Sequence, residues 1–150
     1  HSTIRLPGGK MNWKECKEEK IYERKTNPEE ARSLLKMAEI RQNDNERREV
    51  TEENVSLIVE THWEVQKQLT TALLILEGYK SYSQECLIEF LKQKHDLRKS
   101  HAQKMHQLRR LRNDIDYRGK FLDRDYLDRN QEKIEKITEK LKQKLEKELK

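Results

Sequence analysis

The scarcity of residues that end helices is the feature that most constrains the fold of this chain. Beyond residue 10, only Pro28, Gly78 and Gly119 are glycine or proline, although the chain has 150 residues. Hydrophobic residues make up 33% of the chain and charged residues 41%, so the apolar positions must lie in narrow stripes. We therefore predict an all-α fold, an up-and-down bundle of about five main helices with short connections.

Apolar residues recur at steps of three and four along most of the chain, which is the period of an amphipathic helix. Asn27 followed by Pro28 is the clearest helix start, and Gly78 and Gly119 are expected to end helices in the left-handed conformation. Thr51 and Ser81 are expected to cap the helices that follow them. The expected helices lie within residues 13–24, 28–41, 52–77, 82–95, 97–118 and 127–149.

Residues 1–10 have no apolar period and precede Met11, the expected initiator, so we interpret them as a vector-derived leader. Residues 11–150 then form a single domain. Cys16 and Cys86 lack CxxC spacing and the chain lacks a signal peptide, which predicts free thiols and a cytoplasmic location. No apolar run approaches the ~20 residues of a membrane span.

No metal ion or cofactor is predicted. His101 and His106 are five residues apart, so they do not form the i, i+4 pair of a helical zinc site. The chain has no glycine-rich phosphate loop and no local Ser/His/Asp grouping. His62 lies on an apolar stripe and is interpreted as a hydrogen-bonded core histidine.

Positive charge is concentrated between residues 92 and 120, where ten Lys/Arg stand against three acids. Such a segment can attract phosphates, which Arg side chains hold through two hydrogen bonds, or it can be a solvated helix face. Within it, Arg112 has apolar neighbours at helical spacing and needs a partner, for which Asp116 is four residues away. The predicted phosphate-binding residues are Arg109, Arg110, Arg112, Arg118 and Lys120.

The run Leu111-Arg112-Asn113-Asp114-Ile115-Asp116-Tyr117-Arg118-Gly119 resembles the signature of HEPN domains, the higher eukaryotes and prokaryotes nucleotide-binding family. Residues 31–39 and 78–83 resemble prokaryotic, particularly archaeal, members of that family. The resemblance implies a helical homodimer in which an Arg and a His, with four to six residues between them, face one cleft from both subunits. In active members that cleft is a metal-independent ribonuclease, and such domains often accompany a minimal nucleotidyltransferase in a toxin–antitoxin pair.

The family's Arg corresponds to Arg112 and the following polar residue to Asn113, but Tyr117 stands where the His is expected, with Asp116 before it. An unperturbed Tyr has a pKa of about 10 and an Asp about 3.9, so neither suits proton exchange near neutral pH as a His does. The sequence therefore predicts binding of RNA or a nucleotide phosphate without efficient cleavage.

Two alternatives remain open. One is a divergent metal-independent ribonuclease with Arg112, Asn113, Asp116 and Tyr117 as its catalytic residues, in which Asp116 or Tyr117 replaces the histidine. The other is a protein-interaction module that uses its last helix as the contact surface, with Arg112 paired to Asp116 for structural reasons only.

Overall fold

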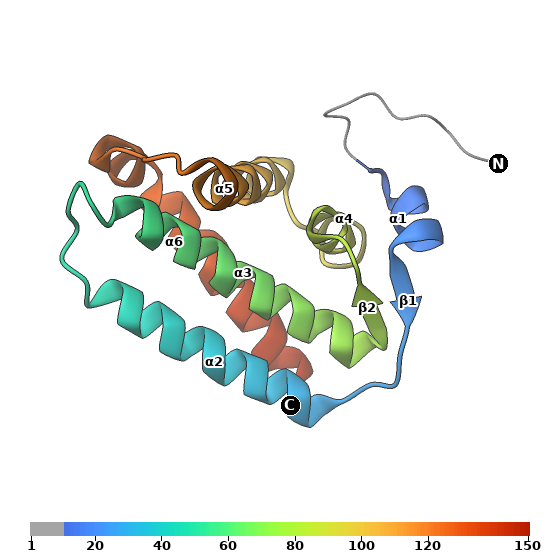
Figure 1. Ribbon diagram of the computed structural model, residues 1–150. Coiled ribbons are helices and arrows are strands. Elements are labelled where there is room, and N and C mark those ends of the chain that lie inside the picture. The colour runs from blue at the N-terminus through green and yellow to red at the C-terminus, as the bar shows by residue number, and fades with distance from the viewer. Residues whose placement is uncertain (1–10) are drawn as a thin grey trace.

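The computed structural model describes residues 11–150, and within them the predicted all-α helical bundle is confirmed (Figure 1). The helices are α1 (Trp13–Glu19), α2 (Pro28–Glu46), α3 (Val55–Glu77), α4 (Gln84–Lys94), α5 (Lys99–Arg118) and α6 (Arg124–Glu148). Two short strands, β1 (Ile21–Glu23) and β2 (Tyr79–Ser81), form one antiparallel sheet. The residues interpreted as a leader, 1–10, lie outside the described part.

Helix α3 is the centre of the bundle and is covered by α2, α4, α5 and α6 (Figure 1). Of its 23 residues, 14 are buried, including Trp63, Leu69 and Leu73. A helix that is apolar on most of its circumference has to be surrounded, because a single neighbour would leave apolar surface in water. Helices α2, α4, α5 and α6 are amphipathic and pack against α3, whereas α1 packs on α4.

Several predicted helix ends are confirmed. The Asn27 side chain accepts a hydrogen bond from the backbone N–H of Glu30, with Pro28 in the first turn of α2. Gly78 (φ 84°) ends α3 and Gly119 (φ 63°) ends α5, both in the left-handed region where glycine avoids Cβ strain.

Other predicted boundaries are wrong. Ser83, not Ser81, caps α4, because its side chain accepts from the Cys86 N–H. Helix α3 begins at Val55, after a turn in which Thr51 and Asn54 exchange hydrogen bonds. Helix α2 continues to Glu46, into the polar segment that resembled a linker.

The sheet replaces the second half of a predicted helix. The segment expected to be helical from 13 to 24 leaves the helix after Glu19, and Tyr22 pairs with Lys80 across the sheet. An Ile-Tyr pair suits a pleated strand, and the left-handed turn at Gly78 presents β2 beside it. The sequence could not predict these strands, because a strand of three residues is too short to show a periodic pattern.

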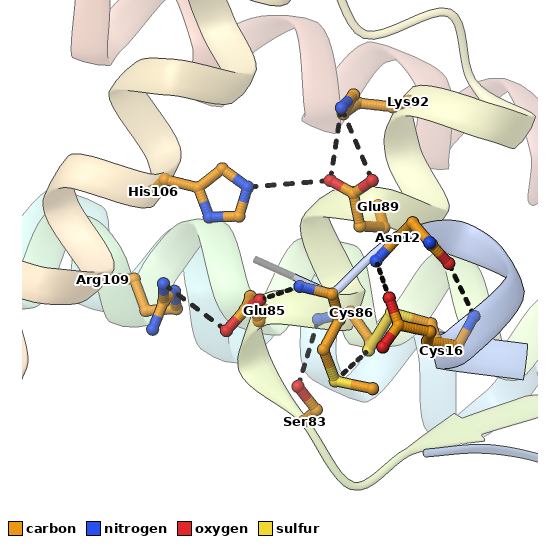
Figure 2. A network of polar contacts seen from close by, with 11 residues as sticks. Asn12, Cys16, Ser83, Glu85, Cys86, Glu89, Lys92, His106 and Arg109 are labelled. Carbon is orange, nitrogen blue, oxygen red and sulfur yellow. Dashed lines mark hydrogen bonds and ion pairs between the residues drawn. A yellow bond between two sulfur atoms is a disulfide. The ribbon is translucent and has the colours of Figure 1, made fainter. Parts of the chain in front are cut away.

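The prediction of free thiols is wrong. Cys16 of α1 and Cys86 of α4 form a disulfide across a sequence separation of 70 residues (Figure 2). Both side chains are fully buried in a small second core with Met11 and Ile21. Two cysteines without motif spacing gave no indication that α1 packs on α4.

The membrane prediction rests on length and hydropathy. Among the helices of residues 11–150, none combines enough length with enough apolar character to cross a bilayer.

Candidate functional site

Arg112 lies on the side of α5 that faces α3 and is held by two carboxylates. Its Nη2 lies 3.1 Å from Asp116 Oδ2, and its Nε lies 3.4 Å from Glu64 Oε1 on α3. Burial lowers the pKa of Arg112, but the charge of Asp116, then Tyr117 and Glu64, raises it above its ordinary value. The local pair expected from the sequence is present, and α3 adds a second acid. We call Glu60, Glu64, Arg112 and Asp116 the Arg112 cluster.

Glu60, one turn before Glu64, gives this cluster a group that titrates near neutral pH. Burial and a hydrogen bond with Asp116 raise the pKa of Glu60 to about 7. The negative charges of Asp116 and Glu64 act in the same direction, and Arg112 opposes them. A carboxyl group at this pKa can exchange a proton at physiological pH, which an ordinary Glu cannot.

The other residues of the motif are placed differently. Asn113 is half-buried, whereas the ring of Tyr117 is 79% exposed. Tyr117 also interacts with the Arg112 guanidinium. The structure thus brings Arg112, Asp116 and Tyr117 together at the end of α5.

The predicted phosphate-binding residues differ in exposure and in their ion pairs. The Arg109 side chain is 15% exposed, and its Nη2 lies 3.9 Å from Glu85 Oε1. The pKa of Arg109 is lowered, and burial is the main cause. Arg118 pairs with Asp114 at 2.5 Å. Arg110 and Lys120 are exposed and have no ion pair among the described residues, but they stand ten positions apart.

A buried polar network joins α4 to α5 and to the first described residues (Figure 2). Glu89 lies 3.7 Å from His106 Nε2 and 3.4 Å from Lys92 Nζ. Burial would raise the pKa of Glu89, but hydrogen bonds from His106 and Lys92 lower it. Glu85 accepts from the Met11 N–H and faces Arg109. Because both acids are matched by donors, this network is structural.

A second candidate surface lies between the start of α5 and the second half of α6. It is a groove of about 340 Å³ lined in part by Arg98, His101, Lys140, Lys144 and Lys147. Basic residues on α6 recur at steps of three and four, which places them on one stripe. We call the basic residues of this groove, Arg98, Lys140, Lys144 and Lys147, together with those that continue the charge beyond it, Lys104, Arg129, Lys133 and Lys136, the basic groove. Asp96 also lines the groove.

The charges of the basic groove are largely uncompensated. Burial, followed by the charges of Lys140 and Arg98, lowers the pKa of His101 at its floor. Desolvation and the repulsion of Arg98 also lower the pKa of Lys140. Arg129 pairs with Asp125 at 2.8 Å, but within residues 11–150 no acid pairs with Arg98, Lys133, Lys136, Lys140 or Lys147.

The sequence analysis missed both Glu60 and the α6 stripe. Glu60 and Glu64 are four residues apart beside an apolar stripe, as are Arg112 and Asp116, so the two pairs carried a weak signal. The lysines of α6 are periodic, but the surrounding glutamates conceal the period. That the start of α5 faces them follows only from tertiary packing.

Compared with protein-family models, curated proteins and solved structures, the chain has no significant match in any of the three. Function therefore has to be inferred from the residues themselves.

The raised pKa of Glu60 predicts a pH-dependent stability. The folded protein keeps the proton on Glu60 up to about pH 7, whereas the unfolded chain releases it near 4.5. The stability that this group contributes is therefore complete below about pH 4.5 and is lost as the pH rises through about 7. Glu60→Gln removes the titration, so at pH 8 it should be more stable than the unaltered protein by about 1 kcal/mol after solvent screening.

Urea unfolding at several pH values between 4.5 and 8 measures this. The stability of Glu60→Gln should fall less over that range. Glu139→Gln, an exposed glutamate of α6, is the matched control and should follow the unaltered protein. Parallel curves for Glu60→Gln and the unaltered protein would show that Glu60 titrates normally.

Proposed function

We propose that this protein binds RNA, with the basic groove as its main contact surface. The observation that carries the proposal is the stripe of lysines on α6 that continues into the groove beside Arg98. Among residues 11–150, no acid forms an ion pair with Lys133, Lys136, Lys140 or Lys147 of this stripe. Like charges held together in this way repel one another, and a polyanion relieves the repulsion while releasing its own counterions. A nucleotide phosphate is the smaller ligand of the same chemistry.

The length of the stripe favours an extended phosphate backbone over a single phosphate. From Arg129 to Lys147 the helix advances about 27 Å at 1.5 Å per residue. A single phosphate could engage only one or two of these side chains.

A membrane surface is a poorer match. An interfacial helix needs an apolar face to enter the lipid, and α6 buries Ile134, Ile137 and Leu141 completely within the bundle. The resemblance of residues 111–119 to the HEPN signature favours RNA over other polyanions. From the same resemblance we keep one further prediction, a minimal nucleotidyltransferase as partner in a toxin–antitoxin pair. The predicted cytoplasmic location rested in part on free thiols, and the Cys16–Cys86 disulfide removes that part of its support.

Removal of three groove charges tests the binding surface. Lys133→Gln/Lys136→Gln/Lys140→Gln should weaken binding of a single-stranded RNA at low salt. It should also reduce the slope of log affinity against log salt by about 2, because each lost phosphate contact contributes about 0.7. Fluorescence anisotropy over a range of salt concentrations measures both quantities.

The matched control is Lys17→Gln/Lys25→Gln/Lys36→Gln, which removes three exposed lysines from other parts of the chain. Both variants lose the same net charge. If RNA binds in the basic groove, only the groove variant should lose affinity, whereas non-specific attraction would weaken both equally. Equal losses in both variants would remove the basis of the proposed surface.

Metal-independent RNA cleavage at the Arg112 cluster is the second candidate function. One observation favours it: the pKa of about 7 at Glu60 supplies a proton-exchanging group beside Arg112, where the family uses a histidine. Against it, Glu60 shares a hydrogen bond with Asp116, and Arg112 is already neutralised by Glu64 and Asp116. The geometry therefore favours binding over cleavage.

We expect the unaltered protein to cleave RNA only weakly in EDTA. Tyr117→His places an imidazole at an exposed position beside Arg112 and should increase the rate, since general acid–base assistance contributes roughly 10²–10⁴-fold. Gel assays with labelled RNA measure this, and Tyr117→Phe is the control for the loss of the hydroxyl. If the unaltered protein cleaves RNA efficiently and Glu60→Gln abolishes cleavage while the fold is preserved, the proposed function is RNA cleavage and not binding alone.

We also propose that two copies pair through the end of α5. Phe121 is 76% exposed and Tyr117 79%, although large aromatic side chains favour burial. The Leu122 N–H donates to Ser56 Oγ at 2.7 Å, which holds this segment beside Leu57, a leucine 48% exposed. Exposed apolar side chains therefore lie at the end of α5, just after it, and at the start of α3, which the hydrogen bond from Leu122 to Ser56 brings near the Arg112 cluster.

Light scattering should give about twice the chain mass of 18.2 kDa. Phe121→Asp should shift the protein toward the monomer, because a charge buried in an apolar interface lacks a partner. Tyr82→Asp, at an aromatic residue 65% exposed just after β2, is the control and should remain dimeric. A strictly monomeric unaltered protein at tens of micromolar would exclude this dimer.

A further inference from the structure

The C-terminal ends of three helices converge at one point. Glu77 is the last residue of α3, His95 follows the last residue of α4, and Glu148 is the last residue of α6. One potential ligand atom from each of these side chains lies within 4.8 Å of the other two. The closest pair is His95 Nε2 and Glu77 Oε2, at 2.6 Å.

We propose that this Glu77–His95–Glu148 cluster binds a divalent transition-metal ion, with Zn²⁺ as the best match. One imidazole nitrogen and two carboxylates are ligands that Zn²⁺ accepts, and a water molecule can complete a four-coordinate site. The two carboxylates also balance the charge of a dication. A nitrogen ligand makes the set less suited to Mg²⁺ or Ca²⁺, which prefer oxygen.

The electrostatics of the cluster favour a cation. Each helix C-terminus carries a partial negative charge from its unpaired carbonyl groups, and here three such ends and two carboxylates meet. The ligand oxygens of Glu77 and Glu148 lie within 4.8 Å of each other, so the two ionised carboxylates repel and a dication between them relieves that repulsion. Lys144 lies nearby, and its ammonium donates to the His95 carbonyl oxygen at 2.7 Å.

The geometry requires only small side-chain movements. Zinc bonds of about 2.0–2.2 Å in a tetrahedron place ligand atoms about 3.4 Å apart. The present separations, from 2.6 Å up to at most 4.8 Å, bracket that value. The His95 ring is only 11% exposed and packs against Phe90 with ring centroids 5.2 Å apart, whereas Glu148 is exposed and leaves a path for the ion.

A metal ion here would join the last turn of α6 to the ends of α3 and α4. The site could not be predicted from the sequence, because residues 77, 95 and 148 share no motif spacing. The site is independent of RNA binding, although Lys144 and Lys147 of the basic groove lie on the same turns of α6. Because only the folded chain brings the three ligands together, bound metal should stabilise the native state over the unfolded chain.

Calorimetric titration of the metal-stripped full chain with Zn²⁺ tests the proposal, together with its melting temperature and the visible spectrum of the Co²⁺ complex. We expect one equivalent to bind, the melting temperature to rise, and Co²⁺ to give d–d bands of a four- or five-coordinate site. His95→Gln and Glu148→Gln should each weaken Zn²⁺ binding at least tenfold.

Glu146→Gln removes the same charge from an exposed position two residues away and should bind like the unaltered protein. Because the Glu148 side chain is exposed, Glu148→Gln should fold normally even if His95→Gln does not. Zn²⁺ binding that is absent, or equally strong in Glu148→Gln, would overturn the proposal, since any metal would then be held elsewhere in the chain.

Discussion

The burial of α3 is the constraint on which the rest of the structure depends. Because 14 of its 23 residues are removed from water, four other helices have to cover it. One polar contact helps to fix their alignment: Gln66, fully buried, donates to Ile134 O and to Thr138 Oγ1 of α6, both at 3.2 Å. A buried amide tolerates few alternative partners, so this contact opposes sliding of α6 along α3.

The same constraint determines where the charges meet. When a chain with 41% charged residues surrounds one apolar helix, its polar residues gather at the margins of narrow buried stripes. Glu60 and Glu64 stand at such a margin of α3 and meet Arg112 and Asp116 from α5. The α6 stripe stands at another margin and meets the start of α5, where the groove is lined by one acid, Asp96, and four Lys or Arg residues. One margin is neutralised and the other is not.

Signals carried by adjacent residues could be read from the sequence, whereas those carried by packing could not. Asn27 with Pro28, Gly78 and Gly119 act on their own backbone, so their roles were predicted correctly. The disulfide of Cys16 and Cys86 joins residues that only the packing of α1 on α4 brings together. Glu60 is similar, because its pKa is set by burial and by Asp116, a residue 56 positions later in the chain.

The two margins suggest an order of events when a polyanion approaches. A phosphate that enters the Arg112 cluster must displace Glu64 or Asp116, and the displaced carboxylate stays partly buried at a cost. In the basic groove the Arg129–Asp125 pair is exposed, so breaking it leaves no buried charge, and the lysines already repel one another. We infer that affinity arises in the groove. Arg112 becomes available only where a neighbouring carboxylate is neutral, and the proton that Glu60 holds below about pH 7 lowers the negative charge around it.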